Sequence, residues 1–157
     1  MQAKQMEHED VGVSEASDLE GLVGYNLKRA YLVVQEDFRT ALGEGGLSAR
    51  VFAALTLTVE NPNITQSALA RMLGIERSGL VAIVDDLEAK GYLKRTAVPG
   101  DRRVQALVPT KTGKTAHAEM VRIVQAHEAA LFADMTAGEK QTLLELLKKI
   151  RSVGGEG

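Results

Sequence analysis

Apolar residues recur every three or four positions along most of the chain, the spacing that places them on one face of an α-helix. The first such stretch has them at positions 19, 22, 23, 27, 30, 31, 34, 38 and 42. It predicts an amphipathic helix with Asp18 as N-cap, ending at the glycine-rich residues 43–46. A second helix runs from its cap Ser48 to about Val59, and because it is apolar nearly all round we expect it in the core.

Two short helices follow. Thr65 is placed to cap the first, which should end at Gly74. Glu76, a less usual cap, precedes the second, which should end at Gly91. A short helix, a turn with glycine and a longer helix form the pattern of a helix-turn-helix.

The next segment has the pattern of a β-hairpin. Residues 92–97 mix apolar and basic side chains, and residues 103–108 alternate between apolar and polar. The Val-Pro-Gly-Asp sequence at 98–101 between them is typical of a turn. A hairpin directly after a helix-turn-helix makes the unit a winged helix-turn-helix.

Two further amphipathic helices complete the chain, beginning after Thr110 and at Thr136. We therefore predict a mainly α fold with a small β-hairpin (α+β), in which residues 48–109 form the winged helix-turn-helix. The helices at 18–43 and 110–153 lie outside that unit and carry broad apolar stripes, so we expect them to be dimerisation helices. Residues 18–153 would be one domain, preceded by an acidic arm at 1–17 that we expect to be disordered.

Composition limits the class of protein. The chain has 157 residues, of which 45% are hydrophobic and 25% charged, as in ordinary globular domains. No apolar run approaches the roughly 20 residues that cross a bilayer, and the first residues lack the pattern of a signal peptide. We expect a cytoplasmic protein with no membrane partner. The absence of cysteine excludes disulfides and thiolate metal sites.

Charge is distributed unevenly. The whole chain has a net charge of −2, but residues 90–114 hold seven Lys and Arg against one acid, Asp101. A cationic hairpin of this kind attracts phosphates. Ordinary solvated surface charge is the alternative for the hairpin taken alone, and the preceding helix-turn-helix favours nucleic acid.

Catalytic and metal motifs are weak. Gly113-Lys114-Thr115 matches the end of a phosphate-binding loop, but the first glycine of that motif is replaced by Val108. The chain contains no G-x-S-x-G sequence. His117 and His127 are ten positions apart, too far for a two-ligand site on one helical turn. We expect no enzyme activity, no metal and no cofactor.

The layout resembles the MarR (multiple antibiotic resistance regulator) family of bacterial transcription regulators over roughly residues 19–151. The most specific motif is Asp101-Arg102-Arg103 followed by Leu107 and then Thr110-Lys111-Thr112-Gly113. Residues 64–70, 73–75 and 87–93 are similar to the family's helix-turn-helix and the entry to its wing. The resemblance implies a homodimer that binds double-stranded DNA at a pseudo-palindromic operator, most often as a repressor.

Two positions depart from the family pattern. Pro109 cannot donate to a ladder, so the second wing strand should end by Val108. Asp85 and Asp86 on the second helix of the motif repel phosphate, so we expect this helix to make few direct contacts with base edges.

We assign DNA contacts accordingly. Arg77 and Ser78 would make most of the major-groove contacts, near a helix N-terminus that also favours phosphate. By resemblance Arg103 would enter the minor groove, and Asp101 would pair with an arginine at the tip of the wing. The complete predicted DNA-binding set is Ser67, Arg71, Arg77, Ser78, Gly79, Ala82, Arg95, Asp101, Arg102 and Arg103.

The resemblance also implies a small-molecule effector, an aromatic or phenolic carboxylate or its coenzyme A thioester, bound between the dimerisation helices and the winged helix. An Asn and a nearby Arg on an apolar face are able to fix a carboxylate. The residues that we assign to this site are Tyr25, Asn26, Arg29, Arg50, Phe52 and His127. For each, a polar core position or a surface side chain is the alternative.

Two functions remain open. The first is a dimeric repressor released from its operator by such an effector. The second is a winged-helix module that docks protein instead of DNA, a function that the Asp85-Asp86 pair favours.

Overall fold

The computed structural model describes residues 18–43, 47–98 and 101–153, with the side chains of 101–103 left out. The expected acidic arm at 1–17 and the turn at 99–100 lie outside these residues. The elements, in chain order, are η1 (Asp18–Gly21), α1 (Val23–Leu42), α2 (Ala49–Glu60), β1 (Ile64–Thr65), α3 (Gln66–Leu73), α4 (Arg77–Ala89), β2 (Leu93–Val98), β3 (Asp101–Pro109), α5 (Lys111–Leu131) and α6 (Ala137–Val153).

The chain divides into two compact units, Met1–Val33 and Val34–Gly157. In the first, the expected continuous helix from Leu19 is wrong. A 3₁₀-helix occupies Asp18–Gly21 and α1 begins at Val23. The side-chain amide of Asn26 donates to the carbonyls of Glu20 (2.7 Å) and Leu22 (2.9 Å). The first bond satisfies the Glu20 carbonyl, which a continuous helix would bond through a backbone N–H, whereas the Leu22 carbonyl also keeps its helical bond from the Asn26 N–H (3.2 Å).

In the second unit, three of the predicted helix caps are confirmed. The hydroxyl oxygens of Ser48, Thr65 and Thr110 each accept a hydrogen bond from a backbone N–H three residues on. Each oxygen thereby satisfies an N–H group that has no partner within the helix. Glu76 occupies the cap position of α4 but makes no side-chain cap bond. Gly74 ends α3 with φ of 63°, which glycine adopts without strain.

The hairpin is confirmed, and it belongs to a three-stranded antiparallel sheet of order β1-β3-β2. β1 is not predicted by any pattern in the sequence; it has only two residues and pairs Ile64 with Leu107. β3 extends one residue beyond the predicted end, since Pro109 is the register partner of Leu93. Proline lacks only the N–H, so it fits at the end of a strand.

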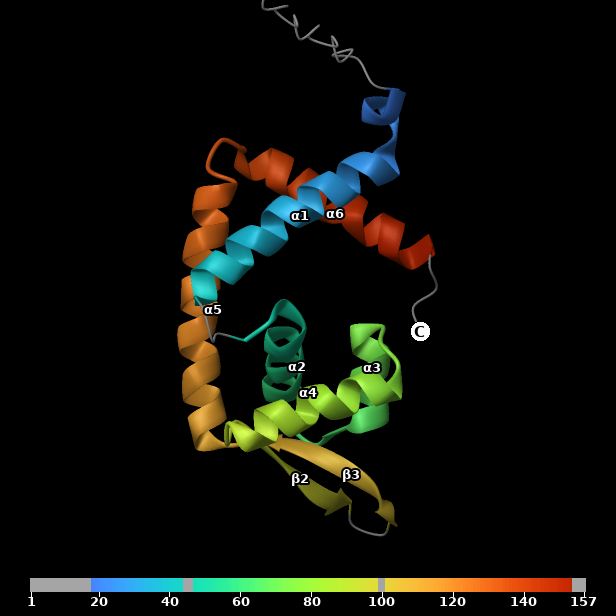
Figure 1. The fold of residues 1–157 in the computed structure, drawn as a ribbon, viewed down its shortest axis with the longest axis vertical. Helices are drawn as coiled ribbons and strands as arrows, with labels where there is room; N and C mark the ends of the chain where they lie inside the picture. The colour runs from blue at the N-terminus through green and yellow to red at the C-terminus, as the bar shows by residue number, and fades with distance from the viewer. Residues whose placement is uncertain (1–17, 44–46, 99–100, 154–157) are drawn as a thin grey trace, which may run out of the picture. The chain divides into compact units, whose positions relative to one another are not determined.

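The core lies where α2 meets the helix-turn-helix and the sheet. α2 contacts α3, α4, α5 and β3, as expected for a helix that is apolar nearly all round. Figure 1 shows α2, α3 and α4 gathered above the β2–β3 hairpin. The largest fully buried apolar side chains are Leu55, Leu69, Leu80, Val84, Leu87, Leu93 and Leu107.

The described residues of α1 and α6 include no buried side chain. None of the described helices is sufficiently long and apolar to span a bilayer. The predicted class, mainly helical with a winged helix-turn-helix, is confirmed.

Candidate nucleic-acid interface

The start of α4 presents its polar face to solvent. Leu80, Val84 and Leu87 are buried, and their spacing places them on one face of the helix, which packs against the core. The remaining positions of the first two turns are therefore directed outward. Among them, the predicted DNA-binding residues Arg77, Ser78, Gly79 and Ala82 are all exposed. They form a surface of one cation, one hydroxyl and two small residues.

α3 contributes a second exposed pair. Ser67 and Arg71 are one turn apart on the same face of the helix, and both are exposed. The side chain of Gln66, at the start of α3, donates to the Gln105 side chain on β3 (3.2 Å).

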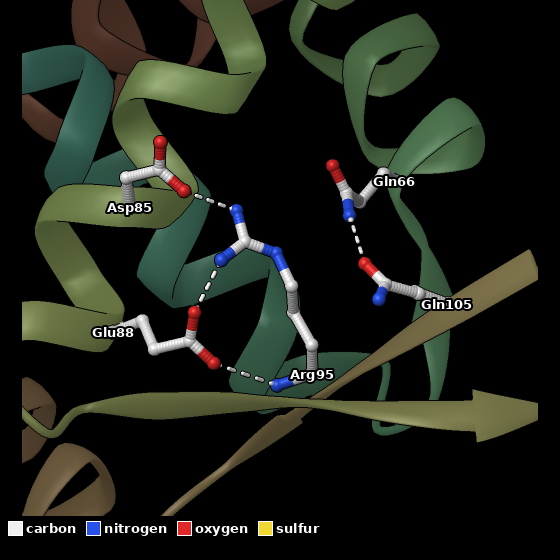
Figure 2. A network of polar contacts seen from close by, with 5 residues as sticks. All are labelled: Gln66, Asp85, Glu88, Arg95 and Gln105. Carbon is white, nitrogen blue, oxygen red and sulfur yellow. Dashed lines mark hydrogen bonds and ion pairs between the residues drawn. The ribbon is translucent and has the colours of Figure 1, made fainter.

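Arg95 lies in different surroundings from the other predicted DNA-binding residues. Its guanidinium forms ion pairs with Asp85 and Glu88 of α4, and its backbone N–H donates to Glu88 Oε1 (3.2 Å). Figure 2 shows the guanidinium between the two carboxylates. Burial disfavours its charge, but the bonds to the two acids outweigh that cost and raise the pKa of Arg95.

The acidic residues of α4 are thus paired within the protein. Asp85 binds Arg95, and Asp86 binds Lys90 one turn later (2.7 Å). Two of the cations in the basic segment are engaged in these pairs, whereas Lys94, Lys111 and Lys114 are exposed. Asp101, Arg102 and Arg103 belong to β3, but their side chains lie outside the described residues. The predicted pairing of Asp101 therefore stays a prediction.

Close packing fixes the wing against α5. A Cβ added to Gly113 would lie 1.9 Å from the carbonyl oxygen of Tyr92. Beside it, the Thr110 hydroxyl donates to the carbonyl oxygen of Gly91 (2.6 Å), and the Thr110 N–H donates to that of Tyr92 (3.0 Å). The Thr-x-x-Gly motif therefore joins the entry of the wing to the start of α5.

Three predicted effector residues lie in the first unit. Arg29 donates to the Tyr25 hydroxyl (3.1 Å), and its guanidinium lies 5.8 Å from the centre of the Tyr25 ring. Asn26 is bound to backbone carbonyls, as described above, so its amide holds the start of α1. The structure brings Tyr25 and Arg29 together.

The other three lie in the second unit. Arg50 is exposed in the first turn of α2. The ring of Phe52 lies between those of Phe38 (5.5 Å between centroids) and His117 (6.1 Å). His127 is 3.5 Å from Asp37, and both line a cavity of about 170 Å³ together with Phe38.

Sequence reasoning missed His117 as a neighbour of Phe52. The Thr56 hydroxyl donates its hydrogen to the Phe52 carbonyl (2.9 Å), so its oxygen accepts from His117 Nε2 (3.0 Å). The helical spacing of Phe52 and Thr56 was readable in the sequence, but their pairing with a residue 61 positions away from Thr56 was not.

A larger, mainly apolar cavity of about 320 Å³ lies between α5 and α6, lined by Phe132, Met135 and Leu147 among others. Among the described residues no group of three or more His, Cys, Asp or Glu is arranged to hold a metal ion.

These features define a winged helix-turn-helix protein with exposed polar residues on its second motif helix and additional helices on both sides of the motif. The sequence model of the MarR family matches residues 45–104. A Thauera aromatica protein assigned as transcriptional regulator of the hcr operon is 32% identical over 131 residues, covering 83% of this chain and 79% of the relative.

Solved structures agree. The transcriptional repressor CouR bound to a 23-mer DNA duplex is 36% identical with a TM-score of 0.82, covering 85% of this chain and 95% of CouR. CouR bound to p-coumaroyl-CoA is 33% identical with a TM-score of 0.79, covering 88% and 98%. A MarR-family regulator from Rhodococcus sp. RHA1 is 26% identical with a TM-score of 0.79, covering 86% and 96%. The chain belongs to the MarR family, and it is a transcription regulator and not an enzyme.

Proposed function

We propose that this protein is a dimeric repressor that binds a pseudo-palindromic operator in the cytoplasm and is released by an aromatic or phenolic carboxylate or its coenzyme A thioester. The observation that carries this proposal is the similarity, over 95% of its length, to a repressor solved on duplex DNA. The exposed start of α4 supplies the matching chemistry in this chain.

The DNA contacts in this proposal follow the exposed residues. Arg77 and Ser78 would read the edges of bases in the major groove, while Gly79 and Ala82 allow the helix to approach closely. Ser67 and Arg71 would hold the phosphate backbone. From the wing, Arg102 and Arg103 would reach the minor groove, where width and A·T content are read.

The alternative, a winged-helix module that docks protein, loses its main support. It rested on the acidic pair of α4, and each of these acids forms an ion pair with a cation of the same chain. The two functions differ in their salt dependence, because release of counterions makes phosphate binding fall steeply with salt. Retention on heparin that is insensitive to salt would favour the protein-docking module.

The wing is tested with Arg103→Ala in a gel shift at fixed salt, using an operator selected from a random duplex library. We expect weaker binding by about 1–3 kcal/mol, the range for one lost specific contact. Lys149→Ala, an exposed cation in the last turns of α6, is the matched control and should leave affinity unchanged. Unchanged affinity of Arg103→Ala would remove the wing from the mechanism.

We further propose that residues 18–43 and 110–153 form the dimer. Exposed apolar residues on both segments support this assignment, for example Leu32 and Val33 on α1 and Leu146 and Ile150 on α6. Two copies related by a two-fold axis would present two helix-turn-helix units, the reading heads of the dimer, about one turn of DNA apart.

The effector part of the proposal is supported by the p-coumaroyl-CoA complex of CouR and by the rings of Phe38, Phe52 and His117. Of these rings, Phe38 lines the cavity of about 170 Å³ and would offer a face for a planar ring, and an arginine such as Arg29 or Arg50 would pair with a carboxylate. The remaining candidates for this site are Tyr25, Asn26 and His127.

Calorimetry with hydroxycinnamates and their coenzyme A thioesters, paired with operator titrations, tests release. A hundredfold loss of operator affinity requires about 2.7 kcal/mol of preference for the form that does not bind DNA. Phe52→Leu should weaken effector binding while leaving operator affinity intact. Ligands that bind without changing operator affinity would contradict induction by this route.

A further inference from the structure

We propose that Arg95 is a positioning residue: it fixes the angle between the wing and α4 through Asp85 and Glu88, and so sets operator specificity without touching DNA. The inference rests on the proposed DNA-binding function and gives this arginine a role other than the direct DNA contact expected from the sequence.

The side chain of Arg95 is less accessible to solvent than its two partners. The side chain of Arg95 is 19% exposed, compared with 59% for Asp85 and 40% for Glu88. The two carboxylates are therefore more accessible to solvent than the arginine that they bind. Nη1 is bound to Glu88 and Nη2 to Asp85, so both ends of the fork are engaged (Figure 2). A phosphate would therefore approach a guanidinium whose charge is already balanced by two carboxylates.

The charge of the cluster formed by Arg95, Asp85 and Glu88 does not favour contact with DNA. Arg95 and its two acids together carry a net charge of −1, so the cluster repels a phosphate at long range. A residue that served DNA binding by attraction would not be placed with two carboxylates. What the cluster offers is geometry: the acids are three positions apart on one helix, and they bind the guanidinium from two sides.

The other strand of the hairpin carries a matching connection. Gln105 of β3 accepts from Gln66 of α3, while Arg95 of β2 holds α4 (Figure 2). β2 and β3 are paired, with Arg95 opposite Leu107 and Ala97 opposite Gln105. Each strand of the hairpin is thus fixed to a different helix of the motif. β1 pairs only with residues 106 and 107 of β3, so the hairpin is two-stranded beyond that point, and the two side-chain connections oppose its twist there.

Arginine suits this position better than lysine does. A planar fork with donors at both ends can bind two carboxylates in fixed directions, whereas an ammonium provides a point charge on a flexible stem. Arg95→Lys therefore keeps the charge and removes the geometry. The triple substitution Arg95→Met, Asp85→Asn and Glu88→Gln removes the cluster and raises the net charge of the protein by one.

The test measures the affinity of each variant for a selected operator and for a random duplex over a range of salt. For both variants we expect operator affinity to fall at least about tenfold, the effect of one lost specific contact. Binding to random duplex should be unchanged in Arg95→Lys and unchanged or tighter in the triple variant. The salt slope of operator binding should not fall.

A matched control is Lys94→Met, an exposed cation next to Arg95 on the same strand. If Lys94 lies near phosphate, this variant lowers the affinity for the operator and for random duplex by the same factor. Circular dichroism and thermal unfolding establish whether each variant is folded. If the triple variant does not fold, Arg95→Lys alone carries the test.

Two results would overturn the proposal. In the first, Arg95→Lys and the triple variant retain wild-type operator affinity. In the second, the affinities for the operator and for random duplex fall in parallel, and the salt slope of binding is reduced by about one. That result would identify a phosphate contact. A wild-type protein that binds neither duplex would instead overturn the proposed function, and this inference with it.

Discussion

Gly113 occupies a position in α5 where no side chain fits. A Cβ there would approach the O, C and Cα atoms of Tyr92 at 1.9, 2.7 and 2.9 Å. All three belong to the backbone, which cannot turn aside as a flexible side chain does. The glycine is therefore needed for space, because it lets the first turn of α5 lie on the residue that begins the wing.

We predict that Gly113→Ala lowers the free energy of unfolding by about 1–3 kcal/mol, the usual cost of overpacking. Urea denaturation followed by circular dichroism at fixed protein concentration measures the change. Gly138→Ala is the control: nothing lies within 4 Å of its added Cβ, so it should be neutral or stabilising by up to about 1 kcal/mol. Equal stabilities of the two variants would contradict the packing argument.

Sequence alone indicated which residues of the interface are polar, but it did not indicate which are available. Arg77 and Ser78 were predictable because the buried spacing of α4 leaves them outside. Arg95 was counted among the DNA contacts because it lies in a run of cations. Its partners are 7 and 10 positions away, and the pairing depends on how the turn after α4 returns the chain along that helix.

Among the elements, α6 begins with a reciprocal cap. The Glu139 carboxylate accepts from the N–H (2.7 Å) and the hydroxyl (2.8 Å) of Thr136, and the Glu139 N–H donates back to that hydroxyl (3.3 Å). This is a capping box. Hydrogen bonds from the backbone and then from the hydroxyl of Thr136 favour the ionised acid and lower the pKa of Glu139.

The stability of this helix end should depend on pH. Because the pKa of Glu139 is lower in the folded protein, its contribution is complete above the ordinary glutamate pKa of 4.5 and is lost as the pH falls through the folded value. We predict that Glu139→Gln reduces amide protection in the first turn of α6 at neutral pH. This difference in amide protection from wild type should disappear when the pH lies below the folded pKa of Glu139.

Hydrogen exchange corrected for intrinsic rates measures this effect. Glu145→Gln is the control on the same helix, since the Glu145 carboxylate accepts from the side chain of Gln141 and not from a helix end. If the difference in amide protection between wild type and Glu139→Gln persisted unchanged in acid, the carboxylate of Glu139 would not be its source.

Elements were predictable where their ends depend on local chemistry. Ser48, Thr65 and Thr110 cap helices because a hydroxyl reaches an N–H three residues away. β1 was not predictable, because two residues carry no periodicity and its existence depends on pairing with β3. The 3₁₀-helix at Asp18–Gly21 was missed because a 3₁₀ turn and an α turn have similar apolar spacing.

For the whole molecule, the apolar residues of α6 separate into two sets. Leu143, Leu144 and Leu147 line the cavity against α5. Leu146, Ile150 and Val153 follow one another by about a turn and are 50%, 46% and 88% exposed. Apolar residues that line up in this way on a monomer mark an interface, and a second copy of the chain is the partner that the proposed function requires.

We predict that Leu146→Glu with Ile150→Glu converts the protein to a monomer at micromolar concentration, because each charge would have to be buried in the dimer. Sedimentation equilibrium measures the change in mass. Operator binding should weaken and its salt slope should fall to about half, since one reading head contacts half as many phosphates.

The control must change the charge equally without touching the apolar stripe. Lys148→Gln with Lys149→Gln, both exposed on α6, lowers the net charge by the same amount. It should remain dimeric and keep the wild-type slope, because uniform charge cannot separate a dimer held by apolar contact. If the glutamate variant stays dimeric, the contact lies elsewhere. A wild-type protein that is already monomeric and binds the full operator would remove the need for two reading heads.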